Sequence, residues 1–109
     1  QQPGTTPAGP VRIGIATVDF ARFTAMSGEE LHRLTHKECA VLKLLVDRAG
    51  EAVTRDEILD RAWSPEEFPT QRTVDNFIVR LRRIVDADPA NPHTIRSIRG
   101  VGYQLEAET

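Results

Sequence analysis

The strongest pattern of hydrophobic positions lies between Thr73 and Val85. Apolar residues recur there at intervals of four, three and four, which is the spacing that lines one side of an α-helix. The pattern therefore predicts a helix that packs against a core along this stripe. The stripe consists of Val74, Ile78, Leu81 and Val85, and Phe77 and Ile84 widen one of its edges.

The opposite side of this helix is mainly polar and positively charged. A rotation of about 100° per residue places a single row there. Such a helix fits the major groove of B-DNA, where an Arg can pair with guanine and an Asn amide with adenine. A charged row is, however, more often only a solvent-exposed face, so this helix alone leaves both interpretations open. The row consists of Arg72, Asn76, Val79 and Arg83, with Arg80 beside it.

The segments on either side predict a small sheet and two further helices. Residues 11–34 contain short runs rich in Val, Ile, Thr and Phe, broken by Gly14 and Gly28, which indicates an antiparallel sheet over a helical core. Thr35 and Glu38 form a capping-box pattern at the start of a helix that ends at Gly50. A second such pattern, from Thr54 to Glu57, opens a shorter helix, and the loop SPEEFP follows it.

After Val85 the chain turns and then predicts a β-hairpin. The stretch DADPANP is rich in turn residues, and HTIRSIRGVGYQLEA reads as two strands joined through Gly100 and Gly102. The hairpin carries Arg96 and Arg99. The predicted fold is therefore α+β, a winged helix-turn-helix with an N-terminal antiparallel sheet, a three-helix core and a C-terminal hairpin wing.

Length and composition indicate one domain preceded by a linker. The chain has 109 residues, of which 39% are hydrophobic, and this suits a single core. Residues 1–10 have three Pro and no charge, which favours a flexible linker, and residues 11–107 form the domain. No apolar run approaches the roughly 20 residues of a membrane span and no signal peptide is evident, so a cytoplasmic location without membrane contact is expected.

The distribution of charge matters more than the formal net charge of −2. Residues 1–69 carry 8 basic and 11 acidic side chains, whereas residues 70–105 carry 6 basic and 3 acidic ones. A phosphate backbone responds to the local field within roughly 8–10 Å, so a basic C-terminal third can bind DNA although the whole chain is acidic.

No catalytic or metal-binding motif is present. The lone Cys39 excludes an internal disulfide and reads as a small core side chain. His32 and His36 are separated by the expected helix cap at Thr35, so they should not share a helix face. No glycine-rich phosphate loop, acid pair or Ser-His arrangement is set by a motif. The sequence therefore predicts a protein that is not an enzyme and that uses no cofactor and no metal.

Four segments taken in order resemble a known family. They are LTHKECAVLKLL, VTRDEILDRAW, RTVDNFIVRLRRIV and IRSIRGVGYQL, and together they look like the signatures of the OmpR/PhoB-type winged-helix domain. This domain is the DNA-binding output module of two-component response regulators. The resemblance covers Val11 to about Glu106, and the combination of RTVD, I-x-x-L-R and R-G-x-G-Y makes chance similarity unexpected.

The resemblance implies roles for individual residues. The helix over residues 72–85 is the recognition helix, Trp63 and Ser97 can meet phosphates, and Arg99 is the wing residue of the minor groove. The positions implied to face DNA on the recognition helix are Arg72, Thr73, Asn76, Phe77, Val79, Arg80 and Arg82, and the exposed row adds Arg83.

The resemblance also implies partners. Members of the family bind direct repeats as head-to-tail homodimers, under the control of an N-terminal receiver domain that this sequence does not contain. The loop that matches residues 64–71 contacts RNA polymerase in activators of the family. Residues 1–10 stand where a receiver would join.

Two positions depart from the family and leave an alternative open. The chain has Phe77 where the family commonly has His, and Val79 where a polar or basic residue is frequent. These side chains can meet a thymine methyl group or pack against another protein. The alternative is a winged helix that serves protein binding through Phe77, Val79 and Phe68. Asp75 would repel phosphate, so we expect it to act as a cap or in an internal ion pair.

Overall fold

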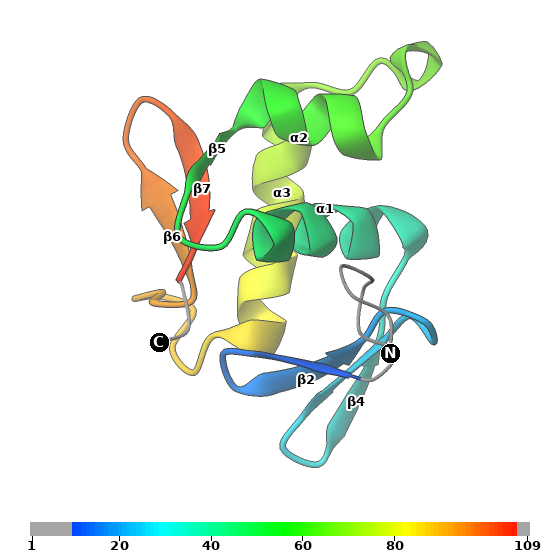
Figure 1. Ribbon diagram of the computed structural model, residues 1–109, viewed down its shortest axis with the longest axis vertical. Coiled ribbons are helices and arrows are strands. Elements are labelled where there is room, and N and C mark those ends of the chain that lie inside the picture. Colours follow the sequence, from blue (N-terminus) through cyan, green and yellow to red (C-terminus); the bar gives the residue numbers. More distant parts are fainter. Residues whose placement is uncertain (1–9, 107–109) are drawn as a thin grey trace, which may run out of the picture.

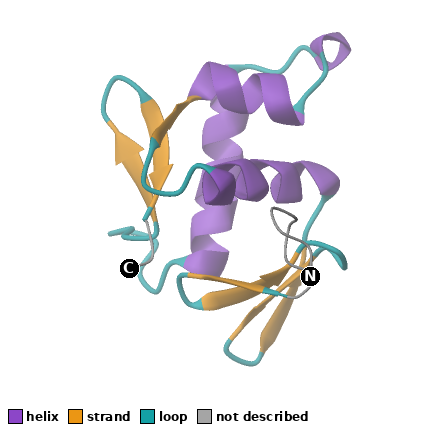
Figure 2. Cartoon of the chain, in the orientation of Figure 1, coloured by secondary structure: helices purple, strands orange, loops and turns teal. Residues whose placement is uncertain are grey.

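The computed structural model describes residues 10–106 and confirms the predicted fold class. Two sheets flank three helices (Figures 1 and 2). Most of the expected linker, residues 1–9, and the end of the expected domain, residue 107, lie outside the described residues.

The first half of the chain forms a sheet and a helix. Four antiparallel strands follow one another in the order β1-β2-β3-β4, and α1 comes next. In register, Val18 pairs with Ala25 and Met26 with Leu31. Alternate residues face inward, so Ile13, Ala16, Val18 and Ala25 are buried. The bounds are β1 Val11–Ile13, β2 Ala16–Asp19, β3 Thr24–Ser27, β4 Glu30–Arg33 and α1 His36–Asp47.

The second half contributes the other helices and a three-stranded sheet. The hairpin β6–β7 stands beside α3 (Figure 1), and β7 is the central strand because β5 pairs with its other edge. Strand β5 was not predicted from the sequence. The bounds are β5 Ala52–Thr54, α2 Arg55–Ala62, the 3-10 helix η1 Pro65–Glu67, α3 Gln71–Val85, β6 Ile95–Ile98 and β7 Gly102–Leu105.

Threonine caps begin all three α-helices of the described chain. The Thr35 hydroxyl accepts from the Glu38 amide at 3.1 Å, and Glu38 Oε1 accepts from the Thr35 amide at 2.8 Å, which completes the predicted box. Thr54 also caps its helix, by accepting from the Glu57 amide at 3.0 Å. Helix α3 begins at Gln71, earlier than predicted, because Thr70 accepts from the Thr73 amide at 3.3 Å. A Thr at the third helical position does not match the usual Glu or Gln signature of a capping box.

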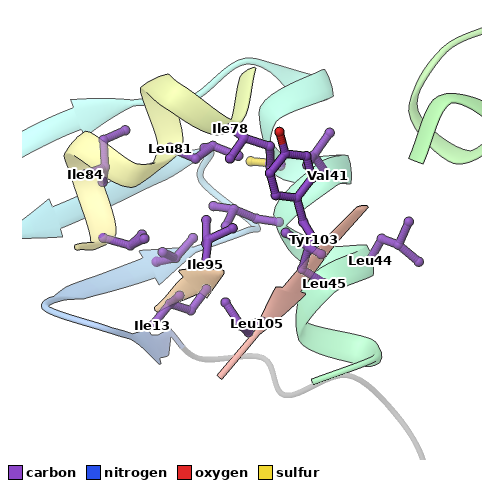
Figure 3. Close-up of a cluster of buried hydrophobic side chains, with 14 of the residues drawn as sticks. Ile13, Val41, Leu44, Leu45, Ile78, Leu81, Ile84, Ile95, Tyr103 and Leu105 are labelled. Atoms are coloured by element: carbon purple, nitrogen blue, oxygen red, sulfur yellow. The ribbon is translucent and has the colours of Figure 1, made fainter. Parts of the chain in front are cut away.

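The predicted hydrophobic stripe of α3 belongs to the core, and Figure 3 shows two of its residues, Ile78 and Leu81, among the buried side chains. All four of its residues are fully buried, and Ile84 is nearly so. Around them lie Leu42 and Leu45 from α1, Ile58 from α2, and Ile95, Tyr103 and Leu105 from the hairpin. Because α3 packs against α1, α2 and the hairpin, one side of it remains open to solvent.

Two glycines permit close backbone approaches, one at the C-terminal end of α3 and the other between β7 and β5. Gly14 has a φ of +60°, and a Cβ there would collide with the Val85 carbonyl oxygen. The next residue, Ile15, donates its amide to that oxygen at 2.9 Å, so the β1–β2 turn satisfies the last turn of α3. Gly102 in β7 faces the Val53 carbonyl of β5, where a Cβ would also collide. The second glycine of R-G-x-G-Y is therefore a packing requirement.

Candidate nucleic-acid interface

The exposed side of α3 carries the predicted row. Arg72, Asn76, Val79 and Arg83 are all exposed, and Val79 retains 48% of its accessible surface. Within residues 10–106, none of these four side chains has a hydrogen bond or ion pair with another part of the protein. The row therefore offers two guanidinium groups, one amide and one aliphatic side chain to solvent along about three turns of helix.

Arg80, beside this row, is held by the protein itself. Its Nε donates to Glu38 Oε2, and its terminal nitrogen donates to the Arg33 carbonyl of β4 at 3.1 Å. Glu38 is only 5% exposed, and its other oxygen caps α1. Arg80 therefore neutralises a buried carboxylate and ties α3 to α1 and β4. The Nε and one terminal nitrogen of Arg80 are thus engaged within the protein, and a contact between Arg80 and DNA stays a prediction.

Arg82, on the other flank of the row, anchors the hairpin. Its Nε donates to the Ile95 carbonyl at 2.9 Å, and its terminal nitrogen donates to the Ser97 hydroxyl at 2.9 Å. Its guanidinium also lies 5.5 Å from the centre of the Tyr103 ring. Arg82 and Ser97 thus join α3 to β6, and the DNA contacts expected of both residues stay predictions.

A polar cluster joins α2, α3 and β7 next to the row. Asp75 accepts from Arg55 at 2.8 Å and from the Tyr103 hydroxyl at 2.6 Å. Burial alone raises the pKa of Asp75, but the hydrogen bonds from Tyr103 and Arg55 outweigh it and hold this pKa below its ordinary value. Asp75 therefore has the internal pairing role expected for it, and its charge is directed at cations of the protein.

Trp63 and Phe77 form an aromatic pair at the N-terminal half of α3. Their ring centres are 4.9 Å apart in an edge-to-face arrangement, and both side chains are half-buried. Phe77 and Val79 are two residues apart, which points them to nearly opposite sides of the helix. The two do not form the single apolar surface that the protein-binding alternative requires.

The wing and the loop before α3 present two further exposed features. Arg99 lies in the turn between β6 and β7, next to Gly100 with a φ of +77°, and no protein partner is found for its guanidinium in the described chain. In the loop, Phe68 is 85% exposed with a φ of +50°. The loop is braced because Glu67 caps η1 at Ser64 and accepts an ion pair from Lys37 at 2.6 Å.

One structural anchor beside α3 had no signal in the sequence. Asp86 follows α3 directly and is 3% exposed. Its carboxylate accepts from the backbone amides of His93 at 2.8 Å and Thr94 at 2.7 Å, which lead into β6. The turn-rich stretch predicted here as a stop is thus held against the end of α3. No periodicity or motif marks Asp86, so only the folded chain reveals this anchor.

Other chemistry is sparse in the described chain. Cys39 is buried, and burial together with the charge of Glu38 raises the pKa of its thiol to about 11, in agreement with a core role. Among residues 10–106, no three His, Cys, Asp or Glu side chains are grouped so that they could hold a metal ion. The same residues include no helix of the length and hydrophobicity needed to cross a membrane.

Comparisons with known proteins place this geometry in a family. The family model named "Transcriptional regulatory protein, C terminal" matches residues 28–105. A probable transcriptional regulator, ycf27, of Galdieria sulphuraria is 39% identical over 93% of this chain and 40% of its own length. The response regulator DrrB, a Thermotoga maritima OmpR/PhoB homolog, matches with a TM-score of 0.75 and 33% identity over 91% of this chain and 45% of its own.

A third similar protein was solved with DNA. The Klebsiella pneumoniae RstA DNA-binding domain in complex with the RstA box matches with a TM-score of 0.67 and 26% identity, over 89% of this chain and 96% of that one. The chain thus spans less than half of the ycf27 and DrrB proteins but nearly all of a separate DNA-binding domain.

The Arg80 contact predicts a loss of stability on substitution. Arg80→Ala leaves the Glu38 carboxylate buried without its cation, and we expect the free energy of unfolding to fall by about 1–2 kcal/mol, less than for a fully buried pair because Arg80 is half-exposed. Urea denaturation measures the change. Glu38→Gln in the Arg80→Ala background should recover part of the loss, whereas Arg83→Ala should leave stability within about 0.5 kcal/mol. Equal effects of Arg80→Ala and Arg83→Ala would contradict this role.

The Asp75 cluster predicts a particular dependence of stability on pH. The pKa of Asp75 is lower in the folded chain than its ordinary value of 3.8. The stability from this group is therefore complete above that value and is lost as pH falls through the lower, folded value. Urea denaturation at several acidic pH values should show a shallower acid loss for Asp75→Asn than for the unaltered chain. Parallel pH profiles would contradict the assignment.

Proposed function

The chain belongs to the OmpR/PhoB-type family of C-terminal domains of transcriptional regulators, and we propose that it binds double-stranded DNA sequence-specifically as the output domain of a response regulator. Helix α3 enters the major groove with its exposed row, and Arg99 of the wing enters the minor groove. The solved complex of the similar RstA domain with its DNA box supports this proposal. Direct contact involves Arg72, Thr73, Asn76, Val79, Arg83 and Arg99.

One observation carries the proposal. The other sides of α3 are in contact with other elements of the fold, while Arg72 and Arg83 of the row and Arg99 of the wing have no side-chain partner among residues 10–106. A guanidinium without a protein partner is available to phosphate or base acceptors at little cost of rearrangement. The nearest acidic side chain on the helix, Asp75, is paired with Arg55 and so repels phosphate less.

The remaining residues that the sequence suggested for DNA contact mainly hold α3 and the wing in place. Arg80 and Arg82 fix the orientation of α3 relative to α1 and the wing, and Ser97 receives the Arg82 contact. Trp63 and Phe77 close the junction of α2 and α3 through their ring contact. The nitrogen of Trp63 and the hydroxyl of Ser97 can still reach phosphates at the edges of the interface.

We also propose partners for this domain, some of which require a longer protein. A receiver or another upstream domain regulates binding, and two copies bind direct repeats head to tail as a homodimer. The loop of residues 64–71 contacts RNA polymerase, which the braced and highly exposed Phe68 supports. We propose the cytoplasm as the location of the protein, because these interactions would take place there.

A protein-binding module is the second candidate function. It rests on the exposure of Phe68 and Val79, but Phe77 is half-buried against Trp63 and faces away from Val79. The apolar surface it requires is therefore divided between separate places on the molecule. The geometry favours DNA binding through α3, with protein contact confined to the loop.

Selection of bound duplexes from a random-sequence pool tests the proposed function. We expect enrichment of a defined motif by the unaltered chain. With the enriched duplex, Arg83→Ala should weaken binding on the order of tenfold, because one phosphate contact is lost. The slope of log affinity against log salt concentration should become shallower by about one unit, which corresponds to one counterion fewer released. Fluorescence anisotropy over a range of salt concentrations measures both quantities.

Arg22→Ala is the matched control. Arg22 is also an exposed arginine, but it lies in the β2–β3 turn, so the net charge changes equally while α3 is untouched. This control should retain the affinity and salt dependence of the unaltered chain. Equal losses of DNA affinity for Arg22→Ala and Arg83→Ala would show that the interaction depends only on total charge. The absence of any enriched duplex would contradict sequence-specific DNA recognition.

A further inference from the structure

We infer that α3 reads an A·T-containing step at the centre of its half-site, with the Asn76 amide on an adenine and the Val79 methyl groups on a neighbouring thymine. This inference deepens the proposed function and rests on it. It names the base pairs that the exposed row selects and assigns the two residues that select them.

Two arginines near the centre of the row are bound within the protein and are therefore poorly placed to read bases. A guanine is commonly read by a free guanidinium that forms two hydrogen bonds to it. Arg80 and Arg82 flank the centre of the row, but each directs its Nε and one terminal nitrogen at protein acceptors. To read guanine with its Nε edge, Arg80 would have to leave Glu38 buried without a cation, which is costly. The centre of α3 therefore lacks a free guanidinium.

The Asn76 amide is available to pair with a base. Its side chain is exposed, and no hydrogen bond ties its amide to other described residues. An Asn amide offers a donor and an acceptor in one plane, which matches N7 and the N6 amino group of adenine in the major groove. No other base presents this pair of groups at adjacent positions of that groove.

Val79 is an aliphatic residue in the middle of a polar row. Exposure of an aliphatic side chain to water is unfavourable, yet 48% of the Val79 surface is exposed between Asn76 and Arg83. Its methyl groups can bury the C5-methyl group of thymine, the one aliphatic group on the major-groove edges of the bases. Asn76 and Val79 are about 4.5 Å apart along the helix axis, close to the rise of one base pair, so the two residues can reach adjacent pairs.

The outer members of the row complete the arrangement. Arg72 and Arg83 lie eleven residues apart on the same side of α3, which corresponds to about 16 Å along the helix. The major groove is about 12 Å wide, so the two cations can reach phosphates at its opposite edges. Phosphate contacts of this kind fix the register of the helix while Asn76 and Val79 supply the sequence preference.

Atomic substitutions in the DNA test the inference. In the duplex obtained by selection, each thymine is replaced singly by uracil, which removes only the C5-methyl group, and each adenine by 7-deazaadenine, which removes N7. We expect one uracil position to weaken binding by the unaltered chain about fourfold, as for one buried methyl group. An adjacent 7-deazaadenine should weaken binding about tenfold.

The variants assign each effect to a residue. Val79→Ala should bind the thymine and uracil duplexes equally, and Asn76→Ala should bind the adenine and 7-deazaadenine duplexes equally. Leu31→Ala, which truncates another exposed aliphatic side chain on β4, should retain both effects. The inference is overturned if no thymine methyl group matters to the unaltered chain, or if the uracil effect persists in Val79→Ala. Failure of the selection itself would instead remove the proposed function, so the two failures are distinguishable.

Discussion

The structure depends on one constraint, namely that α3 must be held on three sides and left free on the fourth. Its hydrophobic stripe fills the centre of the core, and each flank has a polar anchor of its own. Arg80 joins one flank to α1 and β4, and Arg82 and Asp75 join the other to the hairpin. Rigid support of this kind fixes the exposed row in space, which a surface that reads base edges requires.

The anchors also connect parts of the chain that are far apart in sequence. Glu38 caps α1 and receives Arg80, so the start of one helix and the middle of another share a single carboxylate. Tyr103 lies between Arg55 and Arg82 and donates to Asp75, which joins α2, α3 and β7. Because these contacts surround the row without entering it, substitutions in them are expected to affect stability and geometry, whereas substitutions in the row affect binding.

Much of the fold could be predicted because it is encoded in local patterns. The stripe of α3 follows the helical period, the cap at Thr35 follows a short motif, and Gly100 marks the turn of the hairpin. Strand β5 escaped prediction because three residues carry too little periodicity. The start of α3 was placed late because a Thr completes its capping box.

The candidate site was predicted less completely because charge alone does not reveal a partner. Arg72, Arg80, Arg82 and Arg83 look alike in the sequence, yet the first and last are open while the middle two bind Glu38 and the hairpin. These pairings join residues 42 and 13 positions apart, which no local motif encodes. Asp86 shows the same limit, since its role depends on where the chain returns after the turn.

The central claim is the division between arginines that support α3 and arginines that meet DNA. NMR of the arginine Nε–Hε groups, before and after addition of the selected duplex, tests it most directly. We expect the Arg80 and Arg82 signals to be protected from solvent exchange in both states, and those of Arg72 and Arg83 to become protected only with DNA. Release of Arg80 and Arg82 on binding, with Arg72 and Arg83 unchanged, would contradict the account.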